Sequence, residues 1–128
     1  MKIILAITGA SGVAIGVRLA EVLRGEELSI VVSENAKKVI NYELGDANKI
    51  LTQLKKYGKV YGENELDAQP ASGSSLFDAM VVCPCSMRTL SAIANGFSYN
   101  LITRSADVMI GERRKLILVP RETPLSPI

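Results

Sequence analysis

The sequence predicts a three-layer α/β fold, in which helices cover both faces of a parallel sheet. Short runs of consecutive apolar residues are typical of strands that are buried on both faces. Stretches with apolar residues at helical spacing alternate with these runs along the 128 residues. Hydrophobic residues make up 48% of the chain, enough for the core of one domain. We therefore expect a single domain over residues 1–128, with right-handed crossovers.

The first predicted strand spans residues 3–7, and a turn over residues 8–12 follows it. Gly9 and Gly12 permit a sharp turn and a close approach of the backbone to a ligand. Ser11 stands where a helix N-cap is expected. A helix that begins here presents free N–H groups that suit a phosphate, although an ordinary tight turn has the same pattern. The next predicted elements are a helix over 12–24 that packs closely through Gly16, a strand over 28–32, and helices over 36–42 and 46–57.

The second half of the chain continues the alternation. Residues 58–71 are polar and irregular, with a short strand near Val60 and Tyr61. The small-residue loop 72–75 lies too close to the next strand for a mobile linker. Pro84 is expected to end that strand because it cannot donate to a ladder. The remaining predicted elements are the strand 79–83, helices over 86–94 and 100–110, and a last strand over 115–119 that Pro120 ends.

Composition excludes several classes of function. The net charge is only +2 and the basic residues are dispersed, so we expect no nucleic-acid interface. The opening run of five apolar residues is too short for a signal peptide or a membrane span, and we expect a cytoplasmic protein. The chain has no His, which excludes an imidazole base or a His metal ligand. Cys83 and Cys85 are separated by one residue and do not fit a zinc site, so no metal is expected, and no cation stands beside Cys85 to activate its thiol.

Candidate ligand-binding residues follow the predicted strands. In parallel α/β sheets, ligands bind beyond the carboxyl ends of the strands. Four segments reach that edge: residues 9–12, Ser33, residues 86–89 and residues 121–122. Hydroxyls and helix N-termini suit a phosphate and a polyol chain, and Arg121 suits a phosphate or an electron-rich ring edge. The turn lacks G-x-G-x-x-G, and Ser33 stands where an acidic residue would hold a ribose, so FMN fits better than a nicotinamide dinucleotide.

Each candidate also has a structural interpretation. Glu43 lies near a helix C-terminus, an unfavourable place for a carboxylate, which favours a functional role over a solvated charge. The purely structural roles to weigh against ligand binding are plain helix caps for Ser33, Ser86 and Thr89, an exposed cation for Arg104, and an ion pair for Arg121 and Glu122.

Six motifs together resemble the UbiX-type flavin prenyltransferases, and the similarity covers nearly the whole chain in order. The motifs are T-G-A-S-G at 8–12, A-S-G-S at 71–74, V-V-C-P-C-S at 81–86 with Thr89, L-I-T-R-S-A-D-V at 101–108, E-R-R at 112–114, and R-E-T-P-L at 121–125.

The resemblance implies a Rossmann-like or flavodoxin-like fold and a dodecamer built from trimers. It implies that the dimethylallyl group of dimethylallyl phosphate is joined to N5 and C6 of reduced FMN without a metal, and that the prenylated FMN serves a UbiD-type decarboxylase. The implied FMN contacts are Gly9, Ala10, Ser11, Ser33, Ser86, Met87, Arg88, Thr89 and Arg121. The implied catalytic or prenyl-phosphate residues are Ser11, Glu43, Arg104 and Glu122.

Two departures from the family pattern motivate a second hypothesis. The family usually has a Lys seven residues after the position of Arg104, where this chain has Gly111. The family also continues beyond the R-E-T-P motif with a region that closes the prenyl-phosphate pocket. The second hypothesis is an FMN-binding module without turnover. A relationship to the FMN-dependent cysteine decarboxylases is disfavoured, because those enzymes rely on a His near the flavin.

Overall fold

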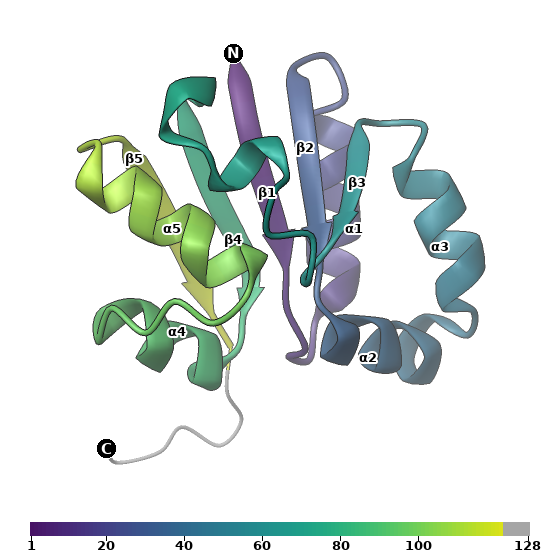
Figure 1. The fold of residues 1–128 in the computed structure, drawn as a ribbon. Coiled ribbons are helices and arrows are strands. Elements are labelled where there is room, and N and C mark those ends of the chain that lie inside the picture. Colours follow the sequence, from purple (N-terminus) through teal and green to yellow (C-terminus); the bar gives the residue numbers. More distant parts are fainter. Residues whose placement is uncertain (122–128) are drawn as a thin grey trace.

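A parallel sheet of five strands, in the order β3-β2-β1-β4-β5, forms the centre of the molecule (Figure 1). We analysed a computed structural model, which describes residues 1–121. The strands are β1 (Lys2–Ile7), β2 (Glu27–Val32), β3 (Lys59–Gly62), β4 (Ala79–Cys85) and β5 (Lys115–Pro120). The helices are α1 (Val13–Val22), α2 (Glu34–Leu44), α3 (Ala47–Leu54), α4 (Met87–Ala94) and α5 (Leu101–Gly111). The predicted α/β fold with a parallel sheet is confirmed.

Strand β1 is the middle of the sheet. It pairs with β2 from Lys2 opposite Glu27 to Ile7 opposite Val32, and it pairs with β4 on its other side. Successive residues of β1 point to opposite faces. Each face carries an apolar core: one surrounds Leu5 beneath α1, α2 and α3, and the other surrounds Ile4 beneath α4 and α5. These two cores explain why the strands are apolar runs rather than alternating sequences.

Helix α1 packs unusually closely on the sheet. A Cβ atom at Gly16 would lie 2.3 Å from the carbonyl oxygen of Cys83 in β4. Only glycine permits this contact, which confirms the predicted packing role of Gly16.

Two local predictions are wrong. The N-cap of α1 is Gly12, at φ +89°, with no side-chain cap hydrogen bond, and Ser11 is not the cap. Strand β4 does not stop at Pro84 but runs to Cys85, which pairs with Pro120 of β5 after an irregularity in the register. Pro84 donates no hydrogen bond, yet its carbonyl oxygen accepts one from the backbone N–H of Thr8 at 3.2 Å. The short strand near Val60 is confirmed as β3.

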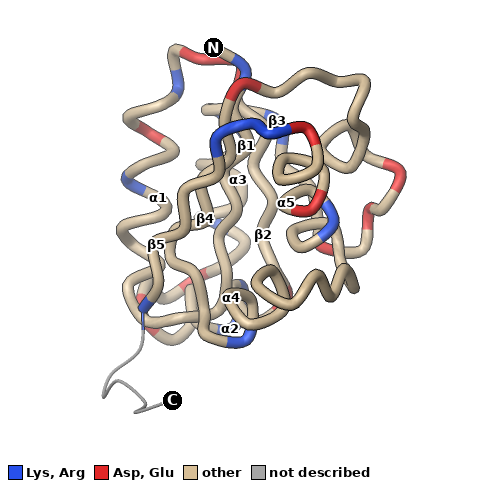
Figure 2. Tube along the Cα trace, turned by 90° about the vertical axis from the view of Figure 1, so that its left-hand side faces the viewer, with Lys and Arg blue, Asp and Glu red and all other residues tan. Residues whose placement is uncertain are grey.

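The loop before β4 is ordered by two short 3-10 turns, Gln69–Ala71 and Gly73–Ser75. It leads to the start of β4 and therefore lies at the edge of the sheet opposite the carboxyl ends of the strands. Acidic and basic residues are interspersed along the trace (Figure 2). None of the described helices has the length and apolar character needed to cross a membrane.

Candidate functional site

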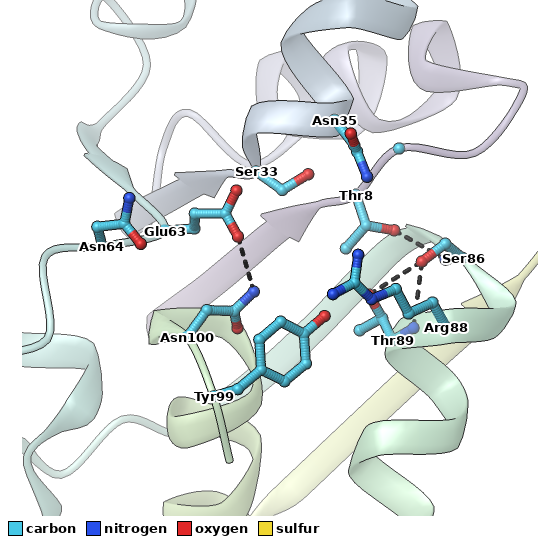
Figure 3. Close-up of a pocket in the computed structure, with 11 residues that line it drawn as sticks. Thr8, Ser33, Asn35, Glu63, Asn64, Ser86, Arg88, Thr89, Tyr99 and Asn100 are labelled. Atoms are coloured by element: carbon cyan, nitrogen blue, oxygen red, sulfur yellow. Dashed lines mark hydrogen bonds between the residues drawn. The ribbon is translucent and has the colours of Figure 1, made fainter. Parts of the chain in front are cut away.

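A cleft of ≈ 390 Å³ opens at the carboxyl edge of the sheet, which we call the inner cleft (Figure 3). After β1 the chain crosses to β2, and after β4 it crosses in the other direction to β5. These diverging connections leave a crevice between β1 and β4, the usual ligand position in such folds. The lining residues are Thr8, Gly9, Ser33, Asn35, Glu63, Asn64, Ser86, Arg88, Thr89, Tyr99 and Asn100.

Three helices begin at the inner cleft, each with a polar side chain as its N-cap. The Ser33 hydroxyl accepts a hydrogen bond from Ala36 N at 3.0 Å and caps α2. Ser86 caps α4 through Thr89 N at 3.2 Å, and Asn100 caps α5 through Thr103 N at 2.9 Å. The structural interpretation of Ser33 and Ser86 as caps is therefore confirmed. Caps also place the positive ends of three helix dipoles at the cleft, which favours an anion.

Thr8 holds the two central strands together beneath these caps. Its hydroxyl donates to the carbonyl oxygen of Pro84 at 2.7 Å and accepts from Ser86 N at 2.8 Å. The side chain is buried, so both hydrogen bonds are shielded from water. Thr8 thereby fixes where α4 starts relative to the end of β1.

Backbone N–H groups supply the donors for a ligand. The first-turn N–H groups of a helix have no partner within the helix. In α2, the N–H of Asn35 has no partner among residues 1–121, and in α4 the same holds for Met87 and Arg88. The wall between them is tight, because a Cβ atom at Gly9 would lie 2.5 Å from Cβ of Asn35. Gly9 thus lets the turn after β1 lie directly against the start of α2 at the wall of the cleft.

The inner cleft carries one cation and one anion. The Arg88 guanidinium lies 5.2 Å from the ring centroid of Tyr99. Glu63 accepts hydrogen bonds from Glu34 N at 2.6 Å and from the Asn100 amide at 2.9 Å. Three helix N-termini and one arginine outweigh the single carboxylate, so the cleft favours an anionic ligand. A phosphate with hydroxyl groups beside it, as in the phosphate and ribityl chain of FMN, fits this arrangement.

A second set of polar residues, which we call the outer rim, comprises Ser11, Glu43 and Arg121. Nε of Arg121 donates to the Ser11 hydroxyl at 3.4 Å. Glu43 reaches across from the last turn of α2, and its carboxylate accepts from Gly12 N at 3.1 Å. Glu43 therefore holds the turn that precedes α1, while no side chain caps the helix itself. All three outer-rim side chains are exposed.

The structure brings most of the sequence-predicted site residues into these two groups. Gly9, Ser33, Ser86, Arg88 and Thr89 line the inner cleft. Ser11, Glu43 and Arg121 form the outer rim, and Ala10 and Met87 adjoin lining residues in the chain. Arg104 is exposed on α5 and does not line the inner cleft, and Glu122 lies outside the described residues.

Sequence reasoning missed six lining residues: Thr8, Asn35, Glu63, Asn64, Tyr99 and Asn100. Thr8 and Asn100 carried a usable signal, since one follows a buried strand and the other precedes a helix. Glu63 carried none, because the segment after β3 is polar and irregular in sequence.

The two cysteines are buried and do not line the inner cleft. Burial raises the pKa of the Cys85 thiol to about 11 and also raises the pKa of Cys83. Their thiols are therefore protonated at neutral pH and unsuited to nucleophilic attack. Among residues 1–121, no three His, Cys, Asp or Glu side chains lie together as a metal site would need.

Comparison with known proteins agrees with this geometry. Residues 1–125 match the protein family described as Flavoprotein. The chain is 53% identical over 130 residues to the flavin prenyltransferase UbiX of Methanocaldococcus jannaschii, in a match that covers 100% of this chain and 69% of that protein. The chain belongs to the UbiX family of flavin prenyltransferases.

Two solved UbiX-family structures superpose closely on the fold. One is a dodecameric FMN-dependent UbiX-like decarboxylase from Escherichia coli O157:H7, with a TM-score of 0.91 and 40% identity over 99% of this chain and 69% of that chain. The other is AnUbiX (PadA1) in complex with FMN and dimethylallyl pyrophosphate, with a TM-score of 0.90 and 43% identity over 98% of this chain and 66% of that chain. The UbiX-family resemblance inferred from the sequence motifs is confirmed.

Proposed function

We propose that this chain joins the dimethylallyl group of dimethylallyl phosphate to reduced FMN and releases prenylated FMN. The observation that carries the proposal is the inner cleft, where helix N-termini and a close-packed Gly9 converge on a position for one phosphate. Membership of the UbiX family supports the reaction type. Reduced FMN supplies the nucleophilic N5 and C6, and dimethylallyl phosphate supplies the five-carbon group as its carbon–oxygen bond breaks.

In this proposal the inner cleft holds the phosphate and ribityl chain of FMN. The free N–H groups of Asn35, Met87 and Arg88 bind the phosphate oxygens. The Arg88 side chain adds a positive charge beside them. Ser33 and Ser86 keep the N-termini of α2 and α4 in place as caps, and the Thr89 hydroxyl accepts a hydrogen bond from Ser86.

The outer rim acts on the prenyl phosphate. Arg121 is its only cation, and it binds the phosphate that departs when the carbon–oxygen bond breaks. Ser11, already within reach of Arg121 Nε, donates a second hydrogen bond. Glu43 accepts the proton that ring closure releases. A similar role for Glu122 remains a prediction.

Arg104 enters the proposal only through a second copy of the chain. It is exposed on α5 and lies outside the inner cleft of its own chain. An oligomer supplies a route by which it reaches the phosphate of a neighbour. Exposed apolar side chains support an oligomer, since Ile117 and Val119 of the edge strand β5 are 45% and 40% exposed. A mass measurement by light scattering tests it.

Gly111 favours the second candidate function, an FMN-binding module without turnover, because it stands where the family pattern has a Lys that would bind a phosphate. It ends α5, which begins at the inner cleft, so its distance from Asn100 is about 16 Å, the length of eleven helical residues. In this proposal a side chain at position 111, like Arg104, reaches the phosphate only in the site of a neighbouring copy of the chain. A Cβ atom there meets nothing within 4 Å, so Gly111→Lys fits the fold.

The deciding experiment is an anaerobic incubation of the protein with reduced FMN and dimethylallyl phosphate. We expect a flavin heavier by one C5H8 unit and one equivalent of inorganic phosphate. Because the AnUbiX complex contains dimethylallyl pyrophosphate, a parallel reaction with that compound distinguishes the two donors. If both the unaltered protein and the Gly111→Lys variant bind FMN but form no prenylated product, the chain is an FMN-binding module without turnover. The UbiD-type recipient and the cytoplasmic location remain predictions.

A further inference from the structure

Glu63 is the one acidic residue among the eleven that line the inner cleft. It follows β3 and reaches over the end of the sheet toward α2 and α5. Figure 3 shows its carboxylate on the side of the cleft opposite Ser86 and Thr89. A carboxylate in an anion-binding cleft opposes the ligand charge, so its presence needs a physical explanation.

The carboxylate is held firmly in place. Oε1 accepts from Glu34 N at 2.6 Å, and Oε2 accepts from the Asn100 side chain at 2.9 Å. The backbone carbonyl oxygen of Glu63 also accepts from Leu101 N at 2.7 Å. These bonds connect the segment after β3 to the N-termini of two helices. Glu63 therefore cannot swing away when an anion enters without losing two hydrogen bonds.

The charge lies close enough to act on a bound phosphate. A sphere of 390 Å³ is about 9 Å across, which is comparable to the Debye length of about 8 Å at physiological ionic strength. Salt therefore screens the repulsion only partly. In addition, Glu63 occupies the N–H of Glu34, one of the donors that α2 would otherwise offer to the phosphate. Both effects weaken phosphate binding specifically and leave the uncharged part of a flavin unaffected.

We propose that Glu63 is a specificity-determining residue that lowers the affinity of the inner cleft for the phosphate of FMN. This inference rests on the proposed function, in which the flavin is substrate and product rather than a permanent cofactor. A transferase whose product is the flavin must release it at each turnover. A fixed carboxylate beside the phosphate position keeps the site strong enough to bind FMN and weak enough to let the product go.

The test compares FMN with riboflavin, which lacks the phosphate, in the full chain and in Glu63→Gln. A purely structural role for Glu63 would change the affinities of both flavins by the same factor. Our proposal expects the ratio of FMN affinity to riboflavin affinity to rise about tenfold in the variant. It also expects FMN to dissociate more slowly while riboflavin does not.

Three further variants make the test decisive. Glu65→Gln removes the same charge two residues away, outside the cleft, and should leave the ratio unchanged. Glu63→Asp retains the charge and should stay near the wild-type ratio. Asn64→Asp adds a charge at an exposed lining residue without touching the hydrogen bonds of Glu63, and it should lower the ratio several-fold even if Glu63→Gln does not fold.

The outcomes separate this inference from the proposed function. An unchanged ratio in a folded Glu63→Gln, or in Asn64→Asp, overturns the inference while FMN binding stands. Absence of FMN binding by the unaltered protein overturns the proposed function and this inference together. A raised ratio in Glu63→Gln with a lowered ratio in Asn64→Asp supports the charge effect.

Discussion

The inner cleft and the outer rim differ in how their geometry is fixed. In the inner cleft, Thr8, Ser33 and Thr89 are 2%, 7% and 6% exposed, and each makes hydrogen bonds to the backbone or to a neighbouring cap. In the outer rim, Ser11, Glu43 and Arg121 are exposed; Arg121 contacts Ser11 at 3.4 Å, and Glu43 contacts Gly12 N at 3.1 Å. The hydroxyl groups of the inner cleft are buried and fixed by the fold, whereas the outer-rim side chains are exposed to solvent.

This difference separates the two parts of the proposed reaction: a single chain already holds the flavin-binding groups in place, but not the groups that act on the prenyl phosphate. The donors of the inner cleft are backbone groups held by the sheet and the helix caps, so they need no rearrangement to bind a phosphate. The side chains of the outer rim have rotamer freedom that a ligand or a neighbouring chain must remove. We therefore expect substitutions in the inner cleft to affect flavin binding and stability, and substitutions in the outer rim to affect turnover.

The largest effect is expected for Gly9→Ala. The added methyl group would lie 2.5 Å from Cβ of Asn35 and 2.9 Å from its carbonyl carbon, so the start of α2 must move. We expect FMN affinity to fall at least about 100-fold and the free energy of unfolding to fall by about 1–3 kcal/mol. Fluorescence titration with FMN and urea denaturation measure the two quantities.

Gly25→Ala is the matched control for this substitution. A Cβ atom at Gly25 meets nothing within 4 Å, and the position is exposed and far from the cleft. The control should bind FMN like the unaltered protein and unfold within about 0.5 kcal/mol of it. Normal FMN affinity in Gly9→Ala would show that the wall beside Gly9 is not part of the flavin site.

The next largest effect is expected for Thr8→Val. Valine has nearly the same shape but leaves Ser86 N without its buried partner, and it removes one of the two hydrogen bonds that the Pro84 carbonyl oxygen accepts from Thr8. We expect a loss of about 2 kcal/mol in the free energy of unfolding and about tenfold in FMN affinity, because α4 is no longer fixed to β1. Urea denaturation and FMN titration measure both losses.

Thr52→Val provides the comparison on an exposed helix surface. The Thr52 hydroxyl donates to Asn48 O within α3, where water can replace the bond. Its removal should change the free energy of unfolding by less than about 0.5 kcal/mol. If Thr8→Val were equally mild, the hydrogen bonds of Thr8 would not be what joins the two strands.

The inner cleft could be predicted from sequence to the extent that it is made by strand ends and helix starts. Gly9, Ser33 and Ser86 follow apolar runs, and the parallel sheet brings such positions to one edge. Glu63 could not be predicted in this way. It reaches the cleft through hydrogen bonds to α2 and α5, which are close to it only after the chain has folded.

Two errors in the predicted fold have the same origin. Ser11 has the chemistry of an N-cap, but its hydroxyl accepts from Arg121 Nε instead, and the helix starts one residue later, after Gly12. Pro84 lacks a donor, but its carbonyl oxygen accepts from Thr8, so the strand continues through it. Local propensity marked each position as a boundary, and a tertiary hydrogen bond decided the outcome.

The smallest effect on flavin binding is expected for Glu43→Gln in the outer rim. The amide oxygen of Gln can still accept from Gly12 N, so the turn that precedes α1 stays in place. We expect FMN affinity within about threefold and stability within about 0.5 kcal/mol of the unaltered protein. Because an amide cannot take up a proton, formation of prenylated FMN should fall about 100-fold.

Glu27→Gln removes an exposed carboxylate at the start of β2 and is the control; it should leave FMN affinity and product formation unchanged. Product formation at the unaltered rate in Glu43→Gln would restrict Glu43 to holding the turn that precedes α1, and another group would have to accept the proton released in ring closure.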